Sequence, residues 1–437
     1  MIQAKIEAAI KRRSKKPGFD FSDAPDHRQE GKVTHAQKHI LNGLLLGLIA
    51  NKPTLRDVEE MTQDLRLAFR TLVPAPISDT TLDTESRRLD AAYLSGKLEQ
   101  QVREDFRAKT LRPVGLPCGV VTVDGKNLAT LDHDAGGAGH ACSQENEKWH
   151  RPGSAKGEEY FLLPVLRAAL TSAETRPIVY QQALPPGTGE ATAFCALVDN
   201  LHRAYGRSGM FEVIEGDAGL ISLANADHVN DLGYTYIFGL KGNQPELYEE
   251  ARRLLEPLAE EEAPEAETPW ERREGKRIRR RLWRTAEMAG IENSVGQWTH
   301  LRQTWLVRQE TEHPDGTLGV EDRYFVTSAL WNYFRPAQIL GLVRGHWRVE
   351  NDCFNSLDVQ WREDSGIWCT KGNAVLGLSL LRVMAYNLVQ MLRRRRLRRK
   401  AEDGSYQEPP SWRSLFKAIM LTLEAALVGD EAILAVG

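Results

Sequence analysis

Three acidic residues, far apart in the chain, are of the type that a magnesium site needs. Asp124 and Asp217 each follow a run of apolar and β-branched residues, and Glu350 lies in a helical pattern. Such runs predict buried strands, and open α/β sheets bind ligands beyond the carboxyl ends of their strands. Mg²⁺ prefers carboxylate oxygens as ligands. If folding brings the three carboxylates together, they form a metal site suited to phosphodiester chemistry.

The chemistry of such a site suggests a role for each acid. Phosphodiester cleavage needs an activated attacking oxygen and a stabilised leaving oxygen, and two Mg²⁺ ions about 3.5–4 Å apart supply both. One shared carboxylate can bridge the pair of ions. We expect Asp124 to be this bridge, with one ion held by Asp217 and the other by Glu350. Mn²⁺ is expected to substitute for Mg²⁺, and no covalent protein nucleophile is needed.

The elements that position these acids follow from hydrophobic patterning. Apolar runs predict strands at residues 120–123, 160–165, 178–184, 211–214 and 234–240. Amphipathic patterns predict intervening helices at 189–205 and 221–232. This order is typical of an α/β fold with a mixed sheet and helices on both faces. The glycine-rich, polar segment 132–157 is predicted to be a loop over the sheet edge.

The first 110 residues have a helical pattern after a polar start. Residues 1–34 are basic with little periodicity, and we predict a partly mobile arm there. Apolar spacings predict a helix from His35, a second one over about 56–72 and a third over about 80–108. Thr54, with Asp57 three residues later, is an imperfect capping box for the second helix. A helix-turn-helix is an alternative for this region, but ordinary helix packing gives the same spacing and is favoured.

The second half of the chain alternates in charge before it becomes helical again. Segment 256–271 is rich in glutamate and proline and predicts a flexible acidic connector. A basic cluster at 276–284 follows, and then strands are predicted at 301–310 and 320–327, joined by the turn Pro314-Asp315-Gly316. Helices are predicted from Pro336, through Ala374–Met391, up to a second basic cluster at 393–400.

Composition limits the class of protein. The chain has 437 residues and a formal net charge of −3, so two or three domains are expected and a simple basic nucleic-acid binder is disfavoured. Five cysteines without a CxxC pair, and the absence of a signal-peptide pattern, predict a cytoplasmic protein without a membrane segment. His140, Cys142 and His150 raise the alternative of a zinc site, but their spacing fits no compact finger and loop residues are favoured.

Several segments together resemble the DDE transposases of bacterial insertion sequences, in the group that includes the H-repeat-associated proteins. The similar segments are Val-Asp-Gly-Lys (123–126), Gly-Leu-Lys-Gly-Asn-Gln-Pro-Glu-Leu-Tyr (239–248), Asp-Arg-Tyr-Phe-Val-Thr-Ser (322–328), Arg-Gly-His-Trp-Arg-Val-Glu-Asn (344–351) and Leu-Asp-Val-Gln-Trp-Arg-Glu-Asp (357–364). Lys-Gly-Asn-Gln-Pro and His-Trp-x-x-Glu-Asn are specific motifs. Their order along the chain makes coincidence an unsatisfactory explanation.

The resemblance implies a ribonuclease H-like core with Asp124, Asp217 and Glu350 as its metal-binding triad. It implies a DNA transposase that cuts and joins insertion-sequence ends by two-metal hydrolysis and strand transfer. The partners implied are double-stranded DNA, both element ends and target, and further copies of the chain in a homodimer or higher homo-oligomer. The protein would be nucleoid-associated when bound to DNA. The alternative is a domesticated or remnant DNA-binding protein, or a nuclease, without transposition.

The chain is expected to have five parts with different roles. They are a helical DNA-binding or oligomerisation domain (1–110), the first part of the ribonuclease H-like core (111–240), a β-rich insertion (241–330), the last part of the core with the catalytic glutamate (331–400) and a C-terminal helical tail (401–437).

Contacts with DNA are expected from basic side chains, although a charge run is more often a solvated surface. Many related transposases carry basic residues around the glutamate, whereas here Leu357 lies seven residues after it and His346 four before it. Arg344, His346, Arg348 or Lys371 would fill that role. The full set of DNA-binding candidates is Lys126, Lys241, Asn243, Lys276, Arg279, Arg280, Arg344, His346, Arg348, Arg394 and Arg395. For Trp298 and Trp305, core packing is favoured over stacking on a DNA base.

Overall fold

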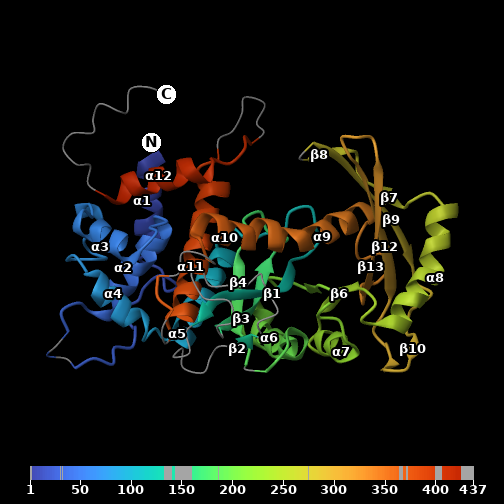
Figure 1. The fold of residues 1–437 in the computed structure, drawn as a ribbon, viewed down its shortest axis with the longest axis horizontal. Helices are drawn as coiled ribbons and strands as arrows, with labels where there is room; N and C mark the ends of the chain where they lie inside the picture. The colour runs from blue at the N-terminus through green and yellow to red at the C-terminus, as the bar shows by residue number, and fades with distance from the viewer. Residues whose placement is uncertain are drawn as a thin grey trace.

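The computed structural model describes residues 2–424, except residues 30, 32, 132–139, 143–159, 186, 274, 364–367, 371–372 and 399–405. The described chain is a mixed α/β structure in which helices flank one large mixed sheet (Figure 1). The N-terminal helices lie at one end of the long axis, and long strands with helix α8 (Pro245–Glu261) lie at the other. The predicted loop 132–157 falls outside the described residues, apart from the short strand β2 (His140–Cys142).

The central sheet follows the predicted order of strands. Its members are β1 (Val120–Leu131), β3 (Tyr160–Leu170), β4 (Ile178–Ala183), β5 (Val213–Gly216) and β6 (Thr235–Leu240). β1 pairs antiparallel with β3 and parallel with β5, and β5 pairs parallel with β6. Helices α6 (Glu190–Tyr205) and α7 (Leu223–Asp231) provide the crossovers that parallel neighbours require. The five predicted strands are confirmed, with β1 and β3 longer than expected.

The sheet continues beyond β6 into the region 241–330. The added strands are β9 (Lys276–Thr285), β12 (Gln303–Glu312) and β13 (Leu318–Thr327). β13 pairs with β6, and β12 lies between β13 and β9. The predicted turn between β12 and β13 is confirmed, and Gly316 supplies its positive φ of 83°. The β-rich region therefore extends the core sheet. A small hairpin, β10 (Glu292–Asn293) and β11 (Gly296–Gln297), lies apart from it.

The prediction of a flexible acidic connector over 256–271 is wrong. Helix α8 runs to Glu261, and two short strands follow it, β7 (Ala266–Glu267) and β8 (Glu271–Arg273). Both strands pair with β9. Glu267 lies 3.4 Å from Arg281 and 3.7 Å from Arg279 of that strand. The acidic segment is ordered because the basic cluster that follows it in sequence lies beside it in the sheet and offsets its charge.

The N-terminal region is helical, with more breaks than predicted. Its helices are α2 (Gln37–Ile49), α3 (Leu55–Gln63), a 3-10 turn at Leu67–Phe69, α4 (Asp79–Ser86) and α5 (Ala91–Arg107). The predicted cap is confirmed, because the Thr54 side chain accepts a hydrogen bond from the Asp57 N–H. The segment predicted as one helix over 80–108 forms two helices. The Asp90 side chain accepts a hydrogen bond from the Tyr93 N–H and so caps the start of α5. The one predicted over 56–72 ends at Gln63.

The C-terminal region supplies the central helix of the fold. Its elements are α9 (Pro336–Arg348), the π-helical turn η5 (Val349–Phe354), α10 (Asn355–Trp361), α11 (Ala374–Met391), the π-helical turn η6 (Leu392–Arg396) and α12 (Trp412–Leu423). α11 is buried along its length and packs against α2 and α5. The stretch Ala374–Arg396 is long and apolar enough to cross a membrane, but 94% of its apolar window is buried inside the protein, as in a core helix.

The prediction of a mobile arm over residues 1–34 is wrong for its first part, which is helix α1 (Ile2–Arg13). Ile6 and Ile10 share one face of this helix and are buried. α1 lies beside α12, so the two ends of the described chain pack together (Figure 1). Arg13 adds an ion pair with Asp105 of α5. A narrow apolar stripe orders a segment that is polar on average.

Candidate active site

Asp124 and Asp217 occupy adjacent positions on two neighbouring parallel strands. The β1–β5 ladder ends with the pair Val123 and Gly216, and the two aspartates are the next residues of each chain segment. Neighbouring strands lie about 4.8 Å apart, and residues at the same register position point to the same face. The first two predicted acids therefore lie together at the carboxyl edge of the parallel strands.

Strand β1 does not end at Asp124, contrary to the sequence-based expectation. Its antiparallel pairing with β3 continues to Leu131, and Asp124 lies opposite Arg167 in that ladder. Only the parallel pairing with β5 stops at this point. Asp217 begins a turn in which its Oδ1 accepts a hydrogen bond from the Gly219 N–H at 2.9 Å. The backbone around Asp124 is fixed by β3, which makes it a rigid platform for a carboxylate.

Glu350 lies in a π-helical turn between α9 and α10. Val349 and Cys353 of this turn are buried, whereas Glu350 is exposed. The connection between β3 and β4 holds the turn in place: Arg176 forms an ion pair with Asp352, and the Arg176 carbonyl accepts a hydrogen bond from the Cys353 thiol at 3.5 Å. Single π-helical turns inside helices are frequent at functional sites.

The negative charges of Glu350 and Asp217 both act on the Asp124 carboxylate. Burial, and then the negative charges of Glu350 and Asp217, raise the pKa of Asp124 to about 7. A single hydrogen bond from the Gly125 N–H, at 2.8 Å, acts in the opposite direction. A carboxylate with few donors and several like charges nearby is stabilised by a cation. This donor set fits a hard divalent ion, although no three such side chains among the described residues already surround a single metal position.

The motif Lys-Gly-Asn-Gln-Pro (241–245) shapes the backbone that follows Asp217. The Asn243 amide donates a hydrogen bond to the Ala218 carbonyl at 2.6 Å, and the Gln244 amide donates one to the Ile221 carbonyl at 3.3 Å. The proline of the motif then starts α8, a position where its missing N–H is not needed. The Asn243 amide is therefore used within the protein, which does not favour the DNA contact predicted for it.

A cavity of about 350 Å³ opens beside Asp217. Lys241 lines it and is exposed to solvent, and Arg323 and Tyr324 of β13 line it from the other side. Arg323 is paired with Glu321 at 2.7 Å. Lys241 thus combines exposure with proximity to the acidic cluster, as the prediction of a DNA contact requires.

The motif segment 357–364 ties the Glu350 region to the sheet through its acids. Asp358 accepts two hydrogen bonds from the Lys126 ammonium, at 2.7 and 2.8 Å. Glu363 is paired with Arg167 of β3 at 2.7 Å. Lys126, a predicted DNA contact, is therefore already held by the protein. Neither pair follows from the sequence pattern, although the acids of this motif are the signal for them.

The basic cluster on β9 is largely neutralised within the protein. Arg279 pairs with Glu310 at 2.6 Å, and Arg280 is only 7% exposed. Lys276, at the start of the strand, is exposed. Arg344 of α9 pairs with Glu271 at 2.7 Å. Of the candidates in this region, Lys276 is the side chain best placed to meet a DNA phosphate.

Several further predictions concern single side chains. Trp298 and Trp305 are 1% and 0% exposed, which confirms core packing. The side chains of His346 and Arg348 lie outside the described part of the structure. The same holds for the three side chains considered for zinc, His140, Cys142 and His150.

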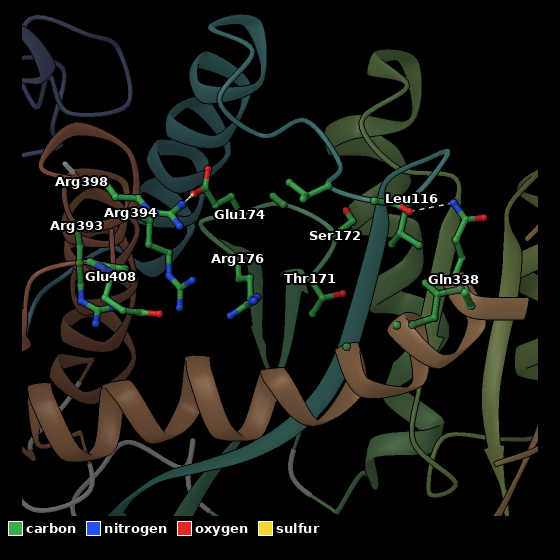
Figure 2. A pocket seen from close by; sticks show the side chains of 18 residues that line it. Leu116, Thr171, Ser172, Glu174, Arg176, Gln338, Arg393, Arg394, Arg398 and Glu408 are labelled. Carbon is green, nitrogen blue, oxygen red and sulfur yellow. Dashed lines mark hydrogen bonds and ion pairs between the residues drawn. The ribbon is translucent and has the colours of Figure 1, made fainter. Parts of the chain in front are cut away.

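A larger pocket of about 740 Å³ lies between α9, the β3–β4 connection and the end of α11 (Figure 2). The basic side chains of its lining are Arg176, Arg393, Arg394 and Arg398, and the acidic ones are Glu174 and Glu408. Figure 2 shows the three arginines that follow α11 grouped on one side, with Arg176 facing them from the β3–β4 connection.

The predicted contacts Arg394 and Arg395 belong to this basic region. Arg394 lines the pocket, and its Nε donates a hydrogen bond to the Gln390 amide oxygen at 3.3 Å. Arg395 is exposed and lies 3.8 Å from Glu174. Glu174 also forms an ion pair with Arg398, at 2.6 Å. The excess of arginine over glutamate leaves the pocket positive.

Comparison with protein families finds a match. The family model described as the transposase DDE domain matches residues 119–388, which is more than half of the chain. The matched region begins immediately before β1, ends within α11 and contains Asp124, Asp217 and Glu350. A search of curated proteins finds no match.

Proposed function

The chain belongs to the transposase DDE domain family, and from this we infer that it is a DNA transposase that cuts and joins the ends of an insertion sequence. The observation that carries the proposal is that two of the acids are neighbours at one edge of the sheet, with the third near enough for its charge to act on the first. Asp217 occupies the register position next to Asp124, and the charge of Glu350 acts on Asp124. These acids come from three separate parts of the matched region.

We propose that Asp124, Asp217 and Glu350 hold two Mg²⁺ ions, or Mn²⁺ in their place, with Asp124 shared between them. Bound metal of this kind activates an attacking oxygen and stabilises a leaving oxygen. The chain contributes the fixed position of each carboxylate. The Gly125 N–H orients one Asp124 oxygen, the Gly219 N–H orients Asp217, and the Arg176–Asp352 ion pair holds the turn that carries Glu350.

The proposed reaction has two stages. In the first stage water attacks the phosphodiester at the element end and the bond from phosphorus to the 3′-oxygen breaks, which releases a 3′-hydroxyl. In the second stage this hydroxyl attacks a phosphodiester of target DNA and displaces the 3′-hydroxyl of the target strand. Both need DNA phosphates near the acids, and we propose that Lys241, Lys276, Arg394 and Arg395 contact the DNA backbone. Residues 1–110 are proposed to bind DNA or a second copy of the chain, so that a homodimer or larger oligomer acts in the cytoplasm on the nucleoid.

The test uses purified full-length protein and duplexes from the genomic flanks of its coding region. With Mg²⁺, nicking at inverted repeats and joining to a second duplex are expected, and both should be lost in Asp124→Ala, Asp217→Ala and Glu350→Ala. The matched control is Asp231→Asn, because Asp231 is exposed and α7 places it at the opposite edge of the sheet.

The other outcomes separate the alternatives. End binding without cleavage would identify a remnant DNA-binding protein. Cleavage without joining would identify a nuclease. Cleavage that survives Asp124→Ala would overturn the assignment of the site.

A further inference from the structure

A fourth carboxylate reaches the edge of the sheet where Asp124 and Asp217 lie. β4 is antiparallel to β3, and β3 is antiparallel to β1, so β4 runs in the same direction as β1. It therefore ends at the edge of the sheet where the parallel pairing of β1 with β5 stops. Helix α6 starts shortly after β4, with Gly189 as its N-cap and Glu190 as its first residue. The topology therefore delivers Glu190 to the acidic edge.

Glu190 lies directly against the residue that follows Asp124. A Cβ atom added to Gly125 would be 1.9 Å from Glu190 Oε1 and 2.6 Å from Oε2, so the carboxylate fills the space that a side chain at position 125 would need. Gly125 has no positive φ, so backbone conformation does not demand glycine here. The absence of a side chain at position 125 is what allows the approach.

The Glu190 carboxylate has no cationic partner in the described structure. Neither a hydrogen bond nor an ion pair to its side chain occurs among the described residues. Its surroundings are acidic instead: Gly125, against which the carboxylate lies, directly follows Asp124, and Asp217 occupies the register position next to Asp124. An unpaired acid placed among other acids costs free energy unless a cation is shared between them.

The helix dipole gives a simpler reason for an acid at position 190. An acid in the first turn of a helix is favoured by the helix dipole. That effect is available in any rotamer that leaves the carboxylate near the helix end. It does not explain why the carboxylate is turned onto Gly125, where it meets two further negative charges.

We propose that Glu190 is a fourth carboxylate ligand of the divalent metal site, acting with Asp124 and Asp217. The inference rests on the function proposed above, since that function supplies the metal. It assigns Gly125 the role of leaving room for the Glu190 carboxylate beside Asp124. The sequence alone gave no sign of this, because a glutamate after Gly-Thr-Gly looks like an ordinary helix start.

The experiment measures Mn²⁺ binding to the full-length protein without DNA, by calorimetric titration or by the electron paramagnetic resonance signal of free Mn²⁺. Glu190→Gln should weaken binding roughly tenfold or more, and Asp231→Asn should leave it unchanged. Gly125→Ala should also weaken it, because the new methyl group displaces the Glu190 side chain. In a Glu190→Ala background, Gly125→Ala should have no further effect.

The outcomes distinguish the two proposals. If the wild-type chain binds Mn²⁺ and cuts end DNA while Glu190→Gln and Gly125→Ala bind Mn²⁺ like wild type, the fourth ligand is refuted and the transposase proposal stands. If wild type binds no Mn²⁺ and Asp124→Asn leaves the cleavage of end DNA unchanged, both proposals fall. Thermal unfolding checks that each variant is folded, and Gly125→Ala decides the question should Glu190→Gln not fold.

Discussion

Arg167 and Glu363 form a fully buried, two-pronged ion pair with both N–H···O distances at 2.7 Å. Their side chains are 0% and 1% exposed. Arg167 lies opposite Asp124 in the β1–β3 ladder, and Glu363 follows the helical segment that carries Glu350. The pair therefore fastens the strand of the first acid to the segment of the third.

Arg167→Met should destabilise the protein by about 3–5 kcal/mol, because it leaves the Glu363 charge buried without its main partner. Urea unfolding measures the change. Arg56→Met is the control, since Arg56 and Glu60 form an exposed pair on α3 and its loss should cost no more than about 0.5 kcal/mol. Equal losses for the two variants would contradict the structural role of the buried pair.

Stability should fall at acid pH through Glu363. Burial alone would raise its pKa, but Arg167 overrides burial and lowers it below the ordinary value of 4.5. The folded-state pKa is then lower than the unfolded one, so the stabilisation is fully present above pH 4.5 and is lost as the pH falls through the folded-state value.

The comparison for this prediction is the double variant Arg167→Met/Glu363→Leu. It removes both charges, so the decline in unfolding free energy between pH 5 and pH 3 should be smaller than in wild type. An unchanged pH profile would show that other carboxylates account for the acid sensitivity.

Asn243→Ala should slow cleavage without weakening the binding of end DNA. Its amide fixes the Ala218 carbonyl, next to Asp217, and misplacing a reacting group by about 1 Å costs up to roughly a hundredfold in rate. Single-turnover cleavage and DNA titration separate the two effects. Lys241→Ala is the matched comparison, with weaker binding expected. If Asn243→Ala instead behaves like Lys241→Ala, the residue acts mainly on DNA.

Arg394→Ala should weaken DNA binding and flatten its salt dependence. Loss of one phosphate contact reduces the slope of log K against log salt by about 0.9. Arg253→Ala on α8 is the control, because that arginine is exposed and paired with Glu250 away from the arginine-lined pocket. Equal slopes for Arg394→Ala and wild type would remove the pocket from the DNA path.

Local patterns determined much of the architecture. Alternating apolar runs and amphipathic segments located the five strands of the central sheet, helix α11 and the cap at Thr54, because each depends on neighbours in sequence. The sequence motifs also related the segments that carry the three acids to one transposase family. Helix α1 and the short strands β7 and β8 do not follow from local pattern, because packing against α12 and pairing with β9 order them.

Long-range pairing alone decided the chemistry around the acids. Only the sheet register shows that Asp217 follows the last residue paired to β1, and that β1 continues past Asp124. Only the fold turns Glu190 onto Gly125 and gives Lys126 and most β9 arginines acidic partners. Residue type fixes what a side chain can bind, but its neighbours come from distant segments, and their charge and burial decide whether it meets metal, DNA or protein.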